Sequence, residues 1–413
     1  MTASDVTSMD AINGVQRNSK IFLVSRCAWT LYNFRSGLMN ELVQRDVRVI
    51  GGGAGDDGFV KPIEDLGVPF KILPVDKKGI NPLADLKLLM SLYRWYRNEK
   101  PDIVHHFTIK PVIYGSLAAR FAGVPRIINT ITGLGYVFTD KEVHLLRRFV
   151  EILYRLSLGV SHTVFFLNRE DLEFFSSRIL PHSEKAVLLP GEGVNCHYFS
   201  SEHYEQISND GKPITFLMVS RLLKDKGVYE FVESAKIVKN RYPETEFHVL
   251  GKRDTRNPNV VSATQIRKWQ ERKFITWHGE ATDVRPFIER SHVIVLPSYR
   301  EGLPKSLLEG SAMEKAIIAT DTIGCRDVVD NGVTGILVPV KDSTALADAM
   351  IQLIEDPVKR RRMGRAGRRK VEREFDEQIV IRQTLAAYGE DECDPTRHEQ
   401  MVTPPESCNK AER

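Results

Sequence analysis

The chain has 413 residues, of which 42% are hydrophobic and 27% are charged, and its formal net charge is only +4. This length predicts two domains, because single cores rarely grow so large, and the composition is that of a globular protein. The small net charge argues against a nucleic-acid-binding protein, but it is compatible with a weak preference for anionic surfaces. Five scattered cysteines without a Cys-x-x-Cys pair fit a reducing compartment better than a disulfide framework.

The two ends of the chain are polar. Residues 1–18 contain no apolar core and therefore do not form a secretory signal. Residues 390–413 contain prolines and show no periodicity, so we expect both ends to be disordered. No apolar run approaches the length of a membrane span. These features predict a cytoplasmic or peripheral protein.

Short apolar, β-branched runs alternate with amphipathic stretches from residue 19 to residue 194. The stretches at 83–99 and 143–158 have the spacing of helices. This alternation is the βαβ pattern of a parallel sheet that is covered on both faces. The predicted strands are 21–25, 47–50, 70–75, 103–107, 126–131 and 163–167.

A polar, turn-rich segment at 195–212 is a predicted linker, and the same pattern then restarts over residues 213–375. The sequence thus predicts an α/β protein of two Rossmann-like, doubly wound domains. Ligands of such sheets bind at the carboxyl ends of strands, so a cleft between the domains is the expected site. The second set of predicted strands is 214–220, 246–251, 274–279, 293–297, 316–320 and 335–338, and the predicted helices are 227–241, 304–313 and 344–354.

The segment SYREGLPKSLLEGSAME at 298–314 follows a predicted strand and begins a predicted helix. Gly302 permits a tight turn, and Pro304 suits the first helical turn, where a missing N–H does no harm. The amino end of this helix is a predicted anion site. We expect the carboxylates of Glu301 and Glu309 roughly 8–12 Å apart, about the span from a nucleotide's ribose to the hexose beyond the diphosphate. The alternative is a pair of solvated glutamates.

A second polar segment, VSRLLKDKG at 219–227, also follows a predicted strand. Arg221 and Lys226 can face the same site from the carboxyl end of that strand. Two cations there would neutralise a diphosphate leaving group, a task that a metal ion performs in other enzymes. No Asp-x-Asp pair stands at a strand end, so we predict no metal site. The alternative is a solvated basic turn.

The two cations and the two glutamates together indicate a function more specifically than either segment does alone. They resemble glycosyltransferase family four, the large group of retaining enzymes with the GT-B fold. The resemblance continues through residues 319–350 and covers roughly residues 20–388. Three segments, KGVYEFVESAKIV, LPSYREGLPKSLLEG and NTITGLGYVF, resemble bacterial N-acetylgalactosaminyltransferases that extend undecaprenyl-diphosphate-linked saccharides.

The resemblance implies a reaction. A hexose or N-acetylhexosamine would move from a nucleotide-diphosphate sugar, with UDP as the expected nucleotide, to a lipid-diphosphate-linked saccharide in polysaccharide, O-antigen or glycan assembly. The enzyme would work on the inner face of the cytoplasmic membrane. Retention implies attack from the leaving group's own face, so a diphosphate oxygen would accept the proton and no protein base or cofactor is expected. A last helix, residues 376–389, would cross back to the first, acceptor-binding domain.

The resemblance also assigns roles to residues of the second domain. Arg221 and Lys226 would hold the donor diphosphate. Glu301 would hold hydroxyls of the donor sugar beside the reacting carbon, and Glu309 would bind the ribose. The other expected donor contacts are Gly302, Leu303, Pro304, Lys305, Ser306, Gly251 and Arg253.

The first domain departs from the family pattern. Many members have a glycine pair after the first strand, where this chain has SRCAWT at 25–30, and Asn33 and Arg35 are the candidate replacements. The glycine-rich run 51–55 follows a strand but opens no helix, so we interpret it as a flexible loop.

The end of the fourth predicted strand also departs from the family pattern. The family often has a histidine near the donor hexose, at the position that Phe107 occupies here. His106 or Lys110 would take its role, although His106 also fits a hydrogen-bonded core histidine. Gly133 and Gly135, in a later loop, are expected to line the same site.

Two stretches, 86–97 and 143–155, mix basic, aromatic and apolar residues at helical spacing. Helices of this kind lie well on anionic lipid, although most amphipathic helices pack on their own sheet. The basic run 359–370 is better interpreted as a solvated helix face. The first stretch contains Arg94, Trp95, Tyr96 and Arg97, and the residues expected to face the membrane are Arg94, Arg147, Arg148 and Arg155.

Three other functions fit part of the pattern. A sugar-nucleotide 2-epimerase shares the architecture but needs acid and base groups around the hexose. A dinucleotide-dependent oxidoreductase needs Gly-x-Gly-x-x-Gly opening a helix, which neither domain has. A non-catalytic sugar-nucleotide-binding subunit would not need the intact set of cations and glutamates.

Overall fold

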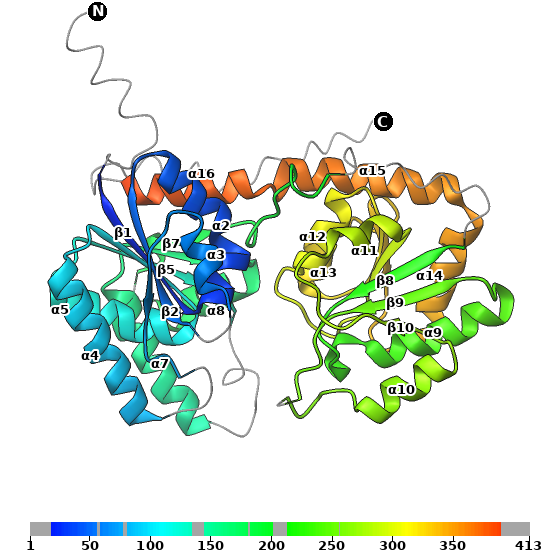
Figure 1. Cartoon of the computed structure of the whole chain (residues 1–413), viewed down its shortest axis with the longest axis horizontal. Coiled ribbons are helices and arrows are strands. Elements are labelled where there is room, and N and C mark those ends of the chain that lie inside the picture. The colour runs from blue at the N-terminus through cyan, green and yellow to red at the C-terminus, as the bar shows by residue number, and fades with distance from the viewer. Residues whose placement is uncertain are drawn as a thin grey trace, which may run out of the picture. The chain divides into compact units, whose positions relative to one another are not determined.

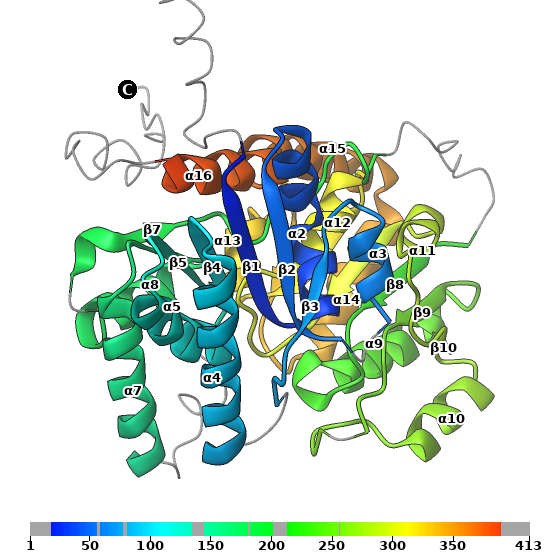
Figure 2. The same ribbon diagram turned by 60° about the vertical axis from the view of Figure 1, so that its left-hand side comes forward.

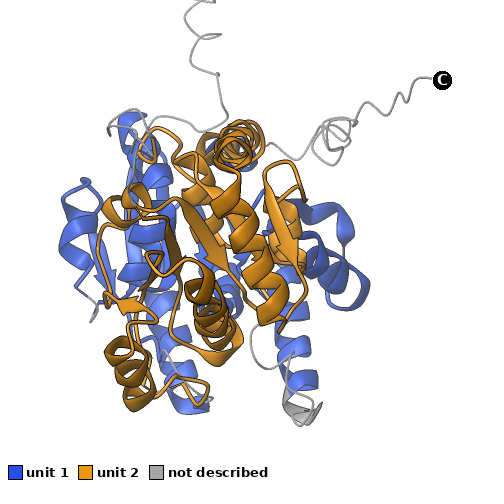
Figure 3. Ribbon diagram, turned by 90° about the vertical axis from the view of Figure 1, so that its right-hand side faces the viewer, with its two compact units in different colours: residues 1–191, 380–413 blue, residues 192–379 orange. Residues whose placement is uncertain are grey.

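The computed structural model describes residues 18–55, 58–76, 81–133, 144–180, 182–200, 213–255 and 257–389. The chain folds into two compact units, unit 1 with residues 1–191 and 380–413 and unit 2 with residues 192–379 (Figure 1, Figure 3). No helix in the described ranges is long and apolar enough to cross a membrane. Predictions for the ends and for most of the linker concern residues outside the described ranges at 1–17, 201–212 and 390–413. The described start of the predicted linker, 195–200, is not a free connection, because Cys196 and Phe199 are buried in a core of unit 2.

Unit 1 is built on a seven-stranded parallel sheet with strand order β3-β2-β1-β4-β5-β6-β7. Its strands are β1 (Lys20–Cys27), β2 (Arg48–Ala54), β3 (Phe70–Ile72), β4 (Ile103–Phe107), β5 (Arg126–Ile131), β6 (Thr163–Phe166) and β7 (Ala186–Leu188). Its helices are α2 (Ala28–Gln44), α3 (Val60–Glu64), α4 (Pro82–Glu99), η1 (Pro111–Gly115), α5 (Ser116–Ala122), α7 (His144–Gly159), α8 (Arg169–Arg178), η2 (Ser183–Lys185) and, from residue 380, α16 (Glu377–Gly389). All six predicted strands are present, and β7 is an additional one.

The alternation of side chains along β1 explains why helices cover both faces of this sheet. Ile21 and Leu23 belong to the core beneath α2 and α16. Phe22 and Val24 point the other way, into the core beneath α4 and α5. Because successive residues of a strand face opposite sides, a continuous apolar run fills both layers.

Unit 2 is built on a six-stranded sheet with strand order β10-β9-β8-β11-β12-β13. Its strands are β8 (Thr215–Val219), β9 (Glu246–Leu250), β10 (Thr276–Trp277), β11 (Val293–Leu296), β12 (Ala316–Thr320) and β13 (Gly335–Val338). Its helices are η4 (Lys224–Lys226), α9 (Val228–Arg241), α10 (Ala263–Glu271), α11 (Arg285–Arg290), α12 (Lys305–Ala312), α13 (Ile323–Val328), α14 (Ser343–Glu355) and α15 (Pro357–Glu374). Every strand pair is parallel, as the sequence predicts.

Each sheet has one point at which the strand order reverses. In unit 1 the reversal lies between β1 and β4, and in unit 2 it lies between β8 and β11. Chains that leave two such neighbouring strands diverge, which opens a crevice at the carboxyl ends where ligands bind. The two polar segments predicted to hold the donor follow β8 and β11, so they begin at the reversal point of unit 2.

The C-terminal helix α16 completes unit 1, as predicted. The hydroxyl of Tyr388 is hydrogen-bonded to Nδ1 of His105 on β4 at 2.7 Å. Arg126 at the start of β5 donates to the backbone oxygen of Ala387 at 2.9 Å. Ile381 and Leu385 are buried in the same core as the residues of α2. The last described helix is therefore an integral part of the first unit.

The glycine-rich run 51–55 is not the flexible loop that the sequence suggested. Its first residues lie within β2, paired with β1 on one side and β3 on the other. A Cβ atom on Gly52 would lie 2.9 Å from the ring of Trp95, and one on Gly51 would lie 2.9 Å from the ring of Phe70. The glycines thus make room for aromatic rings that pack flat on the strand.

Helix α4 buries the two aromatic residues of the stretch that the sequence suggested for a membrane surface. Trp95 and Tyr96 are 8% and 1% exposed, and the ring of Trp95 stacks on Phe22 of β1 with centroids 4.2 Å apart. These two aromatic residues therefore belong to the core and not to a membrane surface. Arg94 and Arg97 of the same helix are exposed.

Candidate active site

Lys226 and Glu301, predicted donor contacts from different segments, form an ion pair. The Nζ atom of Lys226 lies 2.6 Å from Oε1 of Glu301. The side chains are 16% and 13% exposed, so solvent screens the pair only weakly. The residues are 75 positions apart and meet because β8 and β11 are neighbours that end at the same edge of the sheet.

The turn that carries Lys226 depends on Gly227. This glycine has a φ of 75°, in the left-handed region, and a Cβ atom on it would lie 2.0 Å from the carbonyl oxygen of Pro297. Only glycine combines that conformation with so close an approach. The turn after β8 therefore packs directly on the end of β11.

Tyr299 joins the same two segments and was missed by the sequence reasoning. Its N–H donates to the backbone oxygen of Asp225 at 2.9 Å. Its hydroxyl donates to Oε1 of Glu230 on α9 at 2.7 Å. Tyr299 thereby ties the segment that carries Glu301 to residues on either side of Lys226 in the sequence. The available signal was a tyrosine inside the SYREG segment, two residues before the glutamate.

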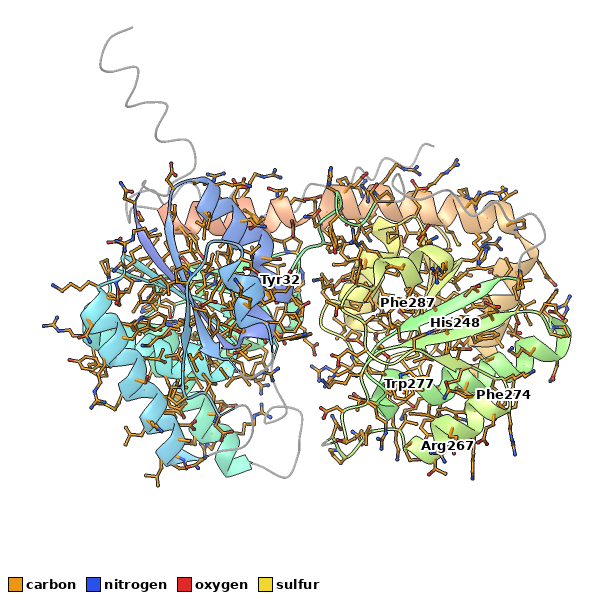
Figure 4. The ribbon with its side chains drawn as sticks, viewed as in Figure 1. Tyr32, His248, Arg267, Phe274, Trp277 and Phe287 are labelled. Carbon is orange, nitrogen blue, oxygen red and sulfur yellow. The ribbon has the colours of Figure 1, made fainter. Side chains whose placement is uncertain are left out.

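Arg221 follows β8 and is exposed, and no ion pair of the described residues involves it. Gly251 has a φ of 149°, and a Cβ atom on it would lie 1.9 Å from the backbone oxygen of the residue before Arg221. The indole N–H of Trp277 donates to the oxygen of Gly251 at 3.0 Å (Figure 4). Arg253 donates to the backbone oxygen of Val261 at 3.0 Å. The ends of β8 and β9 thus bring both arginines to one edge.

Helix α12 begins at Lys305, so Pro304 immediately precedes the helix and is not part of its first turn. No side chain caps this end, and the amides of an uncapped first turn suit an anion. The loop before the helix is tightly held, because a Cβ atom on Gly324 would lie 1.8 Å from the oxygen of Gly302. The partly exposed residues of this segment are Glu301, Leu303, Lys305 and Ser306.

Glu309 lies in the second turn of α12 and is 8% exposed. Burial raises the pKa of its carboxyl to about 7, while Lys305 opposes the shift. The Nζ atom of Lys305 lies 4.0 Å from Oε1 of Glu309. Glu309 therefore changes its charge near neutral pH, which makes it both a hydrogen-bond acceptor and a titrating group.

His106 is a core residue and not a candidate ligand contact. It is fully buried. Its Nδ1 donates to the amide oxygen of Asn129 at 3.1 Å, and its Nε2 accepts from the hydroxyl of Tyr96 at 3.0 Å. Burial lowers the pKa of His106 to about 3, so the ring is neutral. The prediction that it contacts the donor hexose is wrong, because both ring nitrogens serve the interior.

Arg35 is also interior, at 7% exposed. Its guanidinium lies 4.4 Å from the centroid of the Phe107 ring, and it donates to the oxygen of Phe34. Burial lowers the pKa of Arg35 to about 9. In this position the guanidinium packs on the end of β4 and does not face a solvent-accessible phosphate site.

The remaining candidates of unit 1 lie nearer the surface. The amide of Asn33 donates to the backbone oxygen of Trp29 at 2.9 Å. Lys110 follows β4, and its Nζ lies 2.8 Å from Oδ1 of Asp85 on α4. Gly133 is described and has a φ of 142°, whereas Gly135 lies outside the described residues.

Two family models match the chain. Residues 200–370 match the model described as glycosyl transferases group 1, and residues 59–168 match the model described as glycosyl transferase 4-like. The two matches fall on unit 2 and on unit 1, respectively.

Two similar relatives are bacterial enzymes. The chain is 28% identical over 382 residues to N,N'-diacetylbacillosaminyl-diphospho-undecaprenol alpha-1,3-N-acetylgalactosaminyltransferase of Campylobacter jejuni, covering 89% of this chain and 98% of the relative. It is 28% identical over 362 residues to UDP-Gal:alpha-D-GlcNAc-diphosphoundecaprenol alpha-1,3-galactosyltransferase of Escherichia coli, covering 86% and 88%.

Solved structures share the fold. A glycosyltransferase from Rickettsia africae superposes with a TM-score of 0.73 at 20% identity, over 90% of this chain and 98% of that one. The Anabaena protein HepE in complex with UDP-glucose superposes with a TM-score of 0.70 at 16% identity, over 89% and 98%. These likenesses confirm the predicted architecture of two Rossmann-like units.

Proposed function

Because residues 59–168 match the glycosyl transferase 4-like model and residues 200–370 match the glycosyl transferases group 1 model, we propose that the chain is a glycosyltransferase that extends a lipid-diphosphate-linked saccharide. The donor is a nucleotide-diphosphate sugar, with UDP as the nucleotide, and the transferred unit is a hexose or N-acetylhexosamine. The printed names of the two bacterial relatives support this substrate class. The saccharide belongs to a polysaccharide, O-antigen or glycan under assembly.

The observation that carries the proposal is the Lys226–Glu301 pair at the reversal point of unit 2. An enzyme that breaks the bond between a sugar and a diphosphate must stabilise the negative charge that grows on the leaving oxygen. Arg221, Lys226 and the amino end of α12 offer positive potential at one edge of the sheet. Glu301, held beside Lys226, is placed to accept hydrogen bonds from donor-sugar hydroxyls.

Glu309 and the surrounding residues bind the remainder of the donor in this proposal. A carboxylate accepts hydrogen bonds from the paired 2′ and 3′ hydroxyls of a ribose. The backbone from Gly302 to Ser306 contacts the sugar and the phosphates, and Gly251 and Arg253 complete the donor site from the end of β9.

The reaction proceeds with retention and without a metal ion in this proposal. The acceptor hydroxyl attacks from the face that the diphosphate leaves, so a diphosphate oxygen takes the hydroxyl proton as the glycosidic bond forms. Arg221, Lys226 and the amino end of α12 stabilise the negative charge of the leaving group in place of a divalent ion. No protein general base and no cofactor are needed.

A surface on unit 1 suits a lipid-linked acceptor. Helices α4, α5 and α7 lie along one face of the sheet (Figure 2). Arg94 and Arg148 are exposed, and no ion pair of the described residues involves them, whereas Arg147 pairs with Glu151 at 3.0 Å. Apolar side chains at helical spacing on α4 and α7 are exposed by 39–79%: Leu83, Leu86, Met90, Phe149, Ile152 and Leu156.

We name these six apolar residues with Arg94 and Arg148 the apolar–basic surface. Exposed apolar stripes beside cations favour an anionic lipid interface. The enzyme therefore works on the inner face of the cytoplasmic membrane, where the acceptor lipid resides. The free thiols of Cys27, Cys196 and Cys325 fit that reducing compartment.

The test is a turnover assay with UDP-, GDP- and ADP-sugars and a short-chain lipid-diphosphate saccharide, in the presence of excess EDTA. We expect transfer from a UDP-sugar at an undiminished rate, and an α-configured product from an α-configured donor by NMR coupling constants. A strict requirement for added Mg²⁺ or Mn²⁺ would contradict metal independence. Absence of transfer from every nucleotide sugar would contradict the function itself.

A further inference from the structure

The reversal point of unit 1 has the geometry of a ligand site of its own. Strands β1 and β4 are parallel neighbours, with Val24 opposite His106. Their carboxyl ends therefore lie at one edge, where the chain leaves β1 into α2 and leaves β4 into η1. Crevices outside such neighbouring ends are the usual ligand positions of open α/β sheets.

A tryptophan stands in the first turn of the helix that leaves β1. Cys27 precedes helix α2, so Trp29 is its second residue. It is 37% exposed, whereas Trp95, the other tryptophan of unit 1, is 8% exposed. The ring of Phe34 meets Trp29 edge-on, with centroids 5.7 Å apart and planes at 83°. An indole that is held by a neighbouring ring and yet open to solvent is a prepared stacking surface.

Asn33 adds a polar group beside this indole. It lies four residues after Trp29, on the same side of α2, and its amide donates to the backbone oxygen of Trp29 at 2.9 Å. Both residues are at least partly exposed, while Ala28 and Leu31 turn into the core. Helix α2, which also carries Tyr32 (Figure 4), thus offers an aromatic plane with an amide at its border.

A second, independent observation comes from the end of β4. Thr108 has a φ of 70°, a conformation that is strained for a β-branched residue. Its buried hydroxyl has no hydrogen-bond partner among the described residues. Both features cost stability, and strained residues of this kind cluster at functional sites. Thr108 follows Phe107, on whose ring Arg35 of α2 rests, so the strain lies beside the helix that carries Trp29.

We propose that Trp29 and Asn33 bind the saccharide of the acceptor. A pyranose ring has an apolar face of C–H groups and a rim of hydroxyls, which match an indole plane and a bordering amide. Thr108 is a positioning residue: its backbone conformation fixes the direction in which the chain leaves β4, next to helix α2. This inference rests on the proposed function, because it specifies how that enzyme recognises the saccharide that it extends.

The kinetic test uses a water-soluble, short-chain lipid-diphosphate saccharide, so that no membrane is required. Trp29→Ala is expected to raise the KM for this acceptor about 5- to 20-fold. The KM for the donor is expected to stay within about twofold, because the proposed donor contacts are in unit 2. Trp29→Phe keeps an aromatic plane and should recover most of the affinity.

The matched control is Phe121→Ala. Phe121 is an aromatic residue of unit 1 that is 73% exposed, but it ends α5 just before the amino end of β5, at the opposite edge of the sheet. It should leave the acceptor KM unchanged. Thermal unfolding of each variant separates loss of binding from loss of folding.

A binding measurement complements the kinetics. The soluble acceptor saccharide should protect part of the tryptophan fluorescence from iodide quenching in the parent protein, and this protected part should be absent in Trp29→Phe. An unchanged acceptor KM in a folded Trp29→Ala, or protection that survives in Trp29→Phe, overturns the acceptor site while leaving the proposed function intact. A parent protein that transfers no sugar overturns the proposed function instead.

Discussion

Lys226 donates a hydrogen bond of 2.6 Å to Glu301 from a turn that packs against the end of the neighbouring strand. In the absence of substrate, each side chain therefore neutralises the other. A bound diphosphate would draw Lys226 towards its oxygens and leave Glu301 to accept hydrogen bonds from sugar hydroxyls. The pair thus holds both side chains in place before the donor binds, so that they need only a small rearrangement when it does.

Lys226→Ala is expected to lower kcat about 100- to 1000-fold, because the lost charge matters most when the leaving oxygen is most negative. The KM for the donor should change less than kcat does. Lys224→Ala is the control, since Lys224 is an exposed cation in the same turn and should leave turnover within about twofold. Steady-state kinetics with varied donor distinguish the two, and equal effects of both variants would contradict a specific role for Lys226.

Glu309 should make donor binding depend on pH. Its pKa of about 7 means that the carboxyl is largely protonated at pH 6 and ionised at pH 8. An ionised carboxylate accepts stronger hydrogen bonds from ribose hydroxyls, so donor affinity is expected to fall as pH falls through 7. Glu309→Gln should weaken binding at pH 8 by roughly 1.5–3 kcal/mol and should remove the pH dependence. Calorimetric titration of the UDP-sugar at pH 6, 7 and 8 measures both.

The same carboxyl should reduce stability at alkaline pH. The unfolded chain releases this proton near pH 4.5, whereas the native protein holds it up to about pH 7. The free energy of unfolding contributed by Glu309 therefore falls as pH rises across this window, by about 3 kcal/mol. Glu309→Gln, which cannot ionise, should be more stable than the parent at pH 8.5 and about equal at pH 4.5. Thermal melts at both pH values test this, and no gain at pH 8.5 argues that the carboxyl is already well solvated.

Unit 1 should lose stability in acid. Burial lowers the pKa of His106 to about 3 and holds that of His105 well below its ordinary value. The unfolded chain binds these protons near pH 6.5, so stability is lost as pH falls below that value, by up to about 5 kcal/mol for His106 alone. Hydrogen exchange in β4 and β5, followed from pH 7 to pH 4.5, measures the loss. His182→Gln, a change at an exposed histidine, should not alter it, whereas His106→Gln should flatten the acid dependence.

The apolar–basic surface should attach the enzyme to anionic vesicles. A cation near an anionic membrane contributes about 1 kcal/mol, so the charge reversal Arg148→Glu is expected to weaken binding about 10- to 30-fold. Phe149→Ser should weaken binding to anionic and neutral vesicles alike. Arg369→Glu reverses an exposed cation on α15 and serves as the control. Co-sedimentation at low and high salt gives the measurement, and equal binding by Arg148→Glu and Arg369→Glu would contradict the assignment of the surface.

Local patterns in the sequence predicted the strands and helices well where one face or both faces are apolar. The predicted strands 126–131 and 316–320 have the same bounds in the structure, because runs rich in isoleucine and threonine end there before turn residues. The sequence placed both polar segments at the carboxyl ends of strands, but the contact of Lys226 with Glu301 also requires that β8 and β11 be neighbours, which the sequence did not predict.

The errors concern packing between residues that are distant in the sequence. Gly52 lies within a strand because Trp95, on a helix three elements later, covers it. His106 is interior because Tyr96 and Asn129 take both of its nitrogens. Neither neighbour can be identified from the residues next to the glycine or the histidine. Tyr299 was missed for the same reason, since its partner Glu230 lies on another helix.

The hydrogen bond between Tyr388 and His105 can form only after the C-terminal helix has been synthesised, so unit 1 completes its fold late in translation. A ribosome completes the seven strands of unit 1 long before it reaches the helix that covers them, because roughly 190 residues of unit 2 come in between. At about 5–20 residues per second, that gap lasts about 10–40 s. During this time the apolar side chains of Ile21 and Leu23 lack the cover of α16. Unit 1 therefore completes its core only after unit 2 has been synthesised.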